Sequence, residues 1–560
     1  MTALHPERRA TTLGAVHEEH GGALPAVLVL IVVLSALVGA VLAVHVAERR
    51  LVRRDLARAQ ARYAAEAGVQ RVLYHLALDP AFRADGEPLE VPGVQLPVRA
   101  WVRSFGTYAE VRAIAATRPG RASHPGGTAE PAREAEWVGV RALAGAEPGP
   151  GYAYALVLGD SLSTLTLAGD ADITGDVLTG QLGARPGQLQ GRGYRGELRG
   201  RVLRAADRPA GEAGLPLLPP AVLAFAEETF ERYGGAGRRG REGGGFSEGT
   251  GLCPADVAER FGVDFVQGER VFRPGLLLAC TSDGSRLEAE TVDALLSSGK
   301  AHGASSTSPA APPPPSAPPL PDPPPLLLMA EGALDLDGSE APLSLPPGSV
   351  VFARGPLRLR GDIKASGVLL VGESVDAAGP VRLQGQILAR RGARLDGGAR
   401  VRGAVTVLAG RRRPGAAALD LGDTRVDGTV LYVPDADQAR APGAGFVFGE
   451  RAEVRGVLYS SGTAELSGRV RGSTLVRALY FYASPAAYTN WLGTGRFDRG
   501  AMPDPLVLPL ALGGAGDGRP ARPVAFDLVE EGLVRPIGGG PSDRGGPYDA
   551  RVHATRGAAE

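Results

Sequence analysis

The strongest pattern along the chain is an apolar run over residues 23–47, in which His45 is the only residue that can carry a charge. At about 25 residues it is longer than the roughly 20 that an α-helix needs to cross the hydrocarbon core of a bilayer. Strong helix formers follow it until Pro80, with apolar stripes at three- and four-residue spacing, one through Ala65 and Val69 and one through Leu56 and Tyr63. We therefore predict one long helix over residues 22–78, transmembrane at first and then amphipathic.

Alternating apolar and polar residues begin after this helix. They occupy residues 94–102 and 108–114, and they return at 136–143 after a His-Pro-Gly-Gly loop. Alternation with a period of two is typical of strands that bury one face. We expect residues 79–150 to form a small strand-rich unit, a three-strand meander packed on the helix.

A different repeat begins beyond residue 151. Apolar residues alternate and glycine takes the fifth place, and several of these glycines lie multiples of six residues apart. The phrase occurs at 165–177, 357–363, 381–387, 399–405, 424–430, 452–458 and 464–470. Short strands with glycine corners favour a right-handed parallel β-helix, in which each coil buries its apolar row on its neighbours. An antiparallel sandwich would also alternate, but it would not keep a six-residue glycine register.

Residues predicted to point into the β-helix are Leu359, Leu383, Val401, Val454 and Leu466.

The predicted fold class is α+β, with a long helix, a small strand-rich unit and a mainly-β body that contains an insertion. The boundaries are a leader at 1–21, the helix at 22–78, the strand-rich unit at 79–150, first β-helix repeats at 151–205, the insertion at 206–326, the main body at 327–512 and a tail at 513–560. Gly/Arg-rich and Pro-rich stretches define the insertion. The tail is rich in glycine, proline and arginine, so we expect it to be disordered.

Composition adds few constraints on chemistry. The 61 basic and 61 acidic residues balance, which gives no electrostatic case for nucleic acid, and no nucleic acid partner is expected. The two cysteines, Cys253 and Cys280, are too few for a four-ligand zinc site. In an oxidising compartment they could form a disulfide.

No motif predicts a catalytic, cofactor-binding or metal-binding residue. Two GxGxxG matches, at 191–196 and 235–240, are not flanked by a strand and a helix, and a GxSxG match at 245–249 follows no apolar strand. We therefore expect no enzyme and no cofactor. A polysaccharide-active β-helix enzyme is the least favoured alternative, and it would gather acidic residues on one solenoid face. The candidates are Asp362, Asp376, Asp396 and Asp427.

The N-terminal region resembles a known family. Gly21-Gly22-Ala23-Leu24-Pro25 precedes the apolar span, an Arg-rich stretch follows it, and a YAAEAG segment comes next. That segment consists of Tyr63, Ala64, Ala65, Glu66, Ala67 and Gly68. Together these features resemble PilX-type minor pilins and the K-type pseudopilins of type II secretion, over about residues 15–78. As in K-type pseudopilins, Ala26, or Val27 in the alternative alignment, stands where major pilins carry glutamate.

The resemblance implies a function and a location. A prepilin peptidase would cut after Gly21, or after Gly22 in the near alternative. The helix would anchor the protein in the bacterial inner membrane by a single pass, with the body in the periplasm or on a filament surface. Its partners would be other pilins or pseudopilins of a type IV pilus or a type II secretion-type filament.

Two questions stay open at this point. The leader holds two arginines against three glutamates, whereas residues 48–58 hold five arginines against two acids, and the positive-inside rule would place the body in the cytoplasm. The second question is assembly, because a membrane-anchored β-helical scaffold or adhesin that never enters a filament would have the same sequence pattern.

Overall fold

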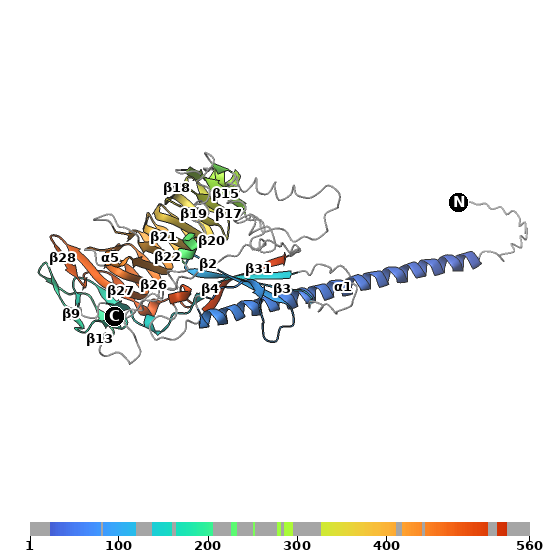
Figure 1. The fold of residues 1–560 in the computed structure, drawn as a ribbon, viewed down its shortest axis with the longest axis horizontal. Helices are drawn as coiled ribbons and strands as arrows, with labels where there is room; N and C mark the ends of the chain where they lie inside the picture. The colour runs from blue at the N-terminus through green and yellow to red at the C-terminus, as the bar shows by residue number, and fades with distance from the viewer. Residues whose placement is uncertain are drawn as a thin grey trace, which may run out of the picture. The chain divides into compact units, whose positions relative to one another are not determined.

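A computed structural model gives the fold of the chain (Figure 1). It describes residues 23–79, 82–118, 137–159, 164–204, 226–231, 250–251, 277–281, 285–294, 326–409, 417–439, 443–512 and 523–534. The chain divides into two compact units, residues 1–60 and 61–560. The first unit contains the beginning of the long helix, and the second contains the end of that helix together with all the strands.

Helix α1 (Ala23–Leu78) is a single helix of 56 residues, as predicted. From Val27 it is long and apolar enough to cross a membrane, with a mean hydropathy of 3.2 in its most apolar window and no residue of that window buried. In the second unit the stripe through Ala65 and Val69 is buried. The stripe through Leu56 and Tyr63 is exposed, at 57% and 69%.

The end of α1 packs on an antiparallel sheet. Its strands are β1 (Asp85–Pro88), β2 (Val98–Phe105), β3 (Tyr108–Ala116), β4 (Trp137–Ala146) and β31 (Pro523–Val534), in the order β1-β2-β3-β4-β31. The expected meander is β2-β3-β4. Strand β31 falls in the range predicted to be disordered, and there that prediction is wrong. The open edge of β4 has unpaired backbone groups, and β31 pairs with them.

The rest of the second unit is a mainly-β body of parallel strands. The strands that pair in succession are β15 (Leu277–Thr281), β17 (Leu326–Ala330), β19 (Val350–Ala353), β20 (Pro356–Ala378), β21 (Arg382–Asp396), β22 (Ala399–Ala409), β24 (Thr424–Pro434), β26 (Glu453–Leu466) and β27 (Arg469–Ala483). Strand β15 lies within the predicted insertion, so the body begins earlier than residue 327. The Pro-rich stretch separates β15 from β17 in sequence without separating them in the sheet.

The first block of repeats closes the other end of this stack. Strand β5 (Leu156–Leu158) pairs in parallel with β27, and β7 (Asp172–Thr174) pairs with β30 (Arg496–Asp498). In Figure 1 the teal strand β13 (Val202–Arg204) lies near orange β27, far from β15. The two blocks that the insertion separates in sequence therefore form one continuous stack.

The repeat register explains the core of the body. All five residues predicted to point inward are buried. The glycines of the phrase form a column, and each pairs with the next across the sheet. These glycines are Gly385, Gly403, Gly428, Gly456 and Gly472. The repeat at 464–470 is an exception, because Gly468 lies at the bend between β26 and β27 and Gly472 takes the place in the column.

The antiparallel sheet and the parallel body contact each other within the second unit. Phe105, at the end of β2, packs in an apolar cluster with Leu327, Leu369 and Leu388 of the body. A backbone bridge joins Ala146 of β4 to Leu508. The sheet on which α1 packs is thus part of the same folded unit as the body.

Candidate functional site

Two of the predicted site elements fall partly outside the described residues. Gly21 and Gly22 precede the first described residue, so cleavage there stays a prediction. Cys253 is also outside the described residues. Cys280 lies on β15, where its backbone pairs with Gly251, two residues before Cys253. The disulfide stays a prediction.

The YAAEAG segment lies on α1 and divides into two faces. Ala64, Ala65 and Gly68 are buried, whereas Tyr63 is exposed. The Nε atom of Arg62 lies 3.0 Å from Oε1 of Glu66, an ion pair along the solvent side of the helix. The small residues of the motif therefore form the face that packs inside the molecule.

α1 approaches the sheet closely at Gly68. A Cβ atom added there would lie 2.7 Å from Cγ1 of Val98 on β2 and 3.0 Å from Cβ of Ala113 on β3. Both neighbours belong to strands held in register by the sheet, so neither can move away freely. The glycine lets the helix lie directly against two strands, which is a packing role.

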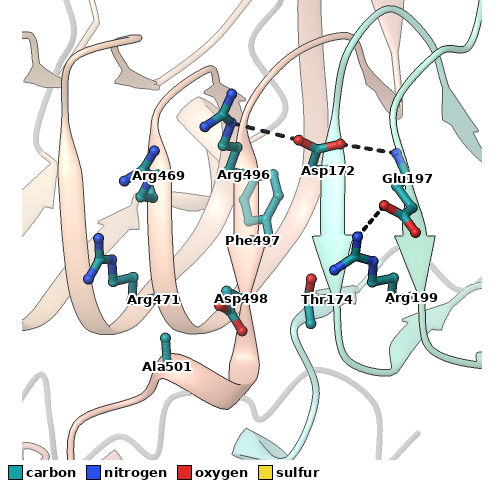
Figure 2. A pocket seen from close by; sticks show the side chains of 10 residues that line it. All are labelled: Asp172, Thr174, Glu197, Arg199, Arg469, Arg471, Arg496, Phe497, Asp498 and Ala501. Atoms are coloured by element: carbon teal, nitrogen blue, oxygen red, sulfur yellow. Dashed lines mark hydrogen bonds and ion pairs between the residues drawn. The ribbon is translucent and has the colours of Figure 1, made fainter.

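A pocket of about 360 Å³ lies where the early and late repeat blocks meet (Figure 2). Ten residues line it, on strands β27, β30, β7 and β12 (Leu198–Arg199) or in the segments directly next to β12 and β30. They are Arg469, Arg471, Arg496, Phe497, Asp498, Ala501, Asp172, Thr174, Glu197 and Arg199. Figure 2 shows their polar side chains arranged strand by strand. None of these residues was predicted from the sequence to belong to a site.

Hydrogen bonds and ion pairs organise one side of the pocket. The carboxylate of Asp172 lies 3.7 Å from Nε of Arg496 and accepts a hydrogen bond of 3.0 Å from the backbone N–H of Glu197. Nη2 of Arg199 donates to Oε2 of Glu197 at 2.6 Å. That bond lowers the pKa of Glu197. Exposed arginine donors and carboxylate acceptors thus lie side by side.

The chemistry available here is binding by charge and hydrogen bonds. Among the described residues, no group of three or more His, Cys, Asp or Glu side chains could hold a metal ion. The aspartates considered for an acidic groove lie among arginines. Asp427 pairs across the sheet with Arg402 and Arg455, and Asp376 pairs with Arg394.

A signal for the pocket was present in the sequence. The positions between the apolar residues of the repeat face outward, and many of them are arginine, as in Arg400-Val401-Arg402-Gly403 and Arg469-Val470-Arg471-Gly472. The sequence does not show which repeats lie next to each other. The strand pairing in the structure does. Asp172 and Arg496 come together although they are far apart in the chain.

No family model matches the chain, and no curated protein sequence matches it. Among solved structures, the chain is similar to the competence-associated pilin ComZ from Thermus thermophilus. The match covers 85% of this chain and 98% of that chain, with 11% sequence identity and a TM-score of 0.21.

Proposed function

We propose that the chain is a minor-pilin-like or pseudopilin-like subunit, anchored in the bacterial inner membrane by α1 and exposing a β-helical body. One observation carries the proposal. α1 is a single helix whose apolar first part is exposed along its length, and whose last part packs on an antiparallel sheet through the small residues of the YAAEAG segment. Exposed apolar surface costs roughly 25 cal/mol per Å² in water, so the first part needs a bilayer or neighbouring helices.

The β-helical description of the body rests on its pairing. From β15 to β27, successive segments pair in parallel, and each repeat stacks its apolar residues and its glycine on those of the previous repeat. An antiparallel sandwich does not account for this pairing. A coil that buries its inner row on the next coil does account for it.

The proposed partners follow from the family resemblance. A prepilin peptidase removes the leader at Gly21, and the freed helix packs with those of other pilins or pseudopilins. The body then lies in the periplasm or on the filament surface. The rival function is a membrane-anchored scaffold or adhesin that never joins a filament.

N-terminal sequencing of the membrane-extracted protein tests the proposal. The mature chain should begin at Gly22 or Ala23, and the double variant Gly21→Val/Gly22→Val should retain the leader because the cut needs a residue without a side chain. Gly14→Val, also in the leader, is the matched control and should be processed normally. An intact Met1 in cells with an active peptidase would contradict the proposal.

Filament fractions separate the two functions. Sheared filaments from cells with the wild-type protein should contain the chain, and those from the double variant should not. A processed chain that is absent from every filament fraction would favour the scaffold or adhesin.

A further inference from the structure

The outer face of the parallel body carries a column of basic side chains on consecutive strands. Lys364, Arg382, Arg400 and Arg425 pair in succession across β20, β21, β22 and β24. The column continues through Glu453 to Arg469 and Arg496, the last two of which line the pocket. We call this run, from Lys364 to Arg496, the basic column.

Only some of the basic side chains in this column form ion pairs with carboxylates. Arg425 pairs with Asp427 at 3.1 Å and Lys364 with Asp362 at 3.6 Å. Within the described part of the chain, Arg382 and Arg400 form no ion pair, although both are exposed and directly opposite each other. Strands are about 4.8 Å apart, and like charges facing each other at that distance destabilise a sheet. An anionic ligand would remove this repulsion.

A second outward column runs beside the first. Its residues, in order, are Arg402, Asp427, Arg455, Arg471 and Asp498. At the pocket the first column meets Asp172 and the second meets Thr174, and Glu197 lies beside Asp172 (Figure 2). The surface therefore presents cations along one line and carboxylate acceptors at intervals beside it.

We propose that this surface binds an acidic polysaccharide, whose carboxylates lie along the basic column and whose hydroxyl groups donate hydrogen bonds to Asp172, Glu197 and the other carboxylates. A linear polymer fits because the cations repeat along one direction, on each strand from Lys364 to Arg425 and, beyond Glu453, again at Arg469 and Arg496. A polyuronate carries one carboxylate per sugar and several hydroxyl donors beside it. Both kinds of group on the protein then have a partner.

The same features disfavour nucleic acid. Proteins that hold single strands stack the bases on aromatic side chains, and neither outward column contains an aromatic residue. The backbone of a duplex presents phosphates without hydrogen-bond donors, so the carboxylates of the pocket would repel it. The inference does not depend on assembly into a filament.

The test uses the full-length protein in detergent micelles and a fluorescent polygalacturonate oligomer, with anisotropy as the readout. The oligomer should bind, and binding should weaken as salt rises because the exposed charges are screened. Arg382→Ser/Arg400→Ser should weaken binding at least tenfold. The control Arg391→Ser/Arg394→Ser removes two exposed arginines that both lie on β21, away from the column. It changes the net charge equally and should bind as wild type.

Unlabelled competitors decide the class of ligand. Polygalacturonate should displace the probe, and neutral dextran should not. A DNA duplex at equal charge concentration should compete at least tenfold less well. Equal or better competition by the duplex would reassign the surface to nucleic acid and overturn the proposal. Absence of binding, or an equal loss in both arginine double variants, would also overturn it.

Discussion

Gln386, on strand β21 of the parallel body, holds Thr107 at the tip of the β2–β3 hairpin. Its side-chain Oε1 accepts hydrogen bonds from the backbone N–H of Thr107 at 3.0 Å and from Oγ1 at 3.3 Å, and its Nε2 donates to the carbonyl of Phe105 at 2.8 Å. The amide is 4% exposed and its partners lie more than 270 positions earlier in the chain. One buried side chain therefore fastens the sheet that carries the end of α1 to the body.

Gln386→Leu should destabilise the second unit by about 2–4 kcal/mol, because a buried N–H and a buried carbonyl lose their partners. Denaturant unfolding of the full-length protein measures the change. Gln384→Leu, two residues away on the exposed face of the same strand, should change stability by less than about 0.5 kcal/mol. Similar losses in the two variants would mean that the hairpin contact contributes nothing specific.

Gly68→Ala should destabilise the packing of α1 on the sheet by about 1–3 kcal/mol, since the new methyl group overlaps Val98 and that cost exceeds the better helix propensity of alanine. Unfolding in detergent, followed by circular dichroism, measures it. At Gly39, on the same helix, an added Cβ would meet nothing within 4 Å, so Gly39→Ala is the control and should not destabilise. A neutral Gly68→Ala would refute the close approach.

The glycine column predicts a graded response. At Gly428 the backbone has φ of +148°, and an added Cβ would lie 1.9 Å from the carbonyl oxygen of Gly403. Gly398 also has positive φ, +82°, but an added Cβ would meet nothing within 4 Å. Gly428→Ala should therefore lower the free energy of unfolding by at least about 3 kcal/mol, and Gly398→Ala should lower it by about 1 kcal/mol. Thermal unfolding distinguishes the two, and equal costs would show that the repeats do not stack closely at the glycines.

Protease digestion and thiol labelling test on which side of the membrane the body lies. The proposed pilin-like function would place the body outside the cytoplasm, where Cys253 and Cys280 should be oxidised. Protease added to intact spheroplasts should digest the body, and thiol labelling without reductant should find no free cysteine. Cys280→Ser, which leaves Cys253 unpaired, supplies the positive labelling control. A protected body with two freely labelled thiols would place it in the cytoplasm, as the charge distribution around the helix favours.

The sequence alone was sufficient to predict the features that depend on residues close together in the chain. The extent of α1 follows from an uninterrupted run of helix formers and the stop at Pro80, because helical hydrogen bonds join residues four apart. The inward places of Leu383 and Val401 follow from alternation, because successive side chains of a strand point to opposite faces. Alternation also located the strands β2 to β4, although β3 is buried along its whole length, so both of its faces are covered.

Only the tertiary structure decided which segments far apart in the sequence are neighbours. Strand β31 pairs with β4, β15 joins the body across the Pro-rich stretch, and β5 closes the stack on β27. Each pairing joins strands whose own patterns allow many partners, and the choice depends on the register and on the chain path between them. The basic column and the pocket arise in the same way. Stacking of the repeats places Arg382 opposite Arg400 and Asp172 opposite Arg496.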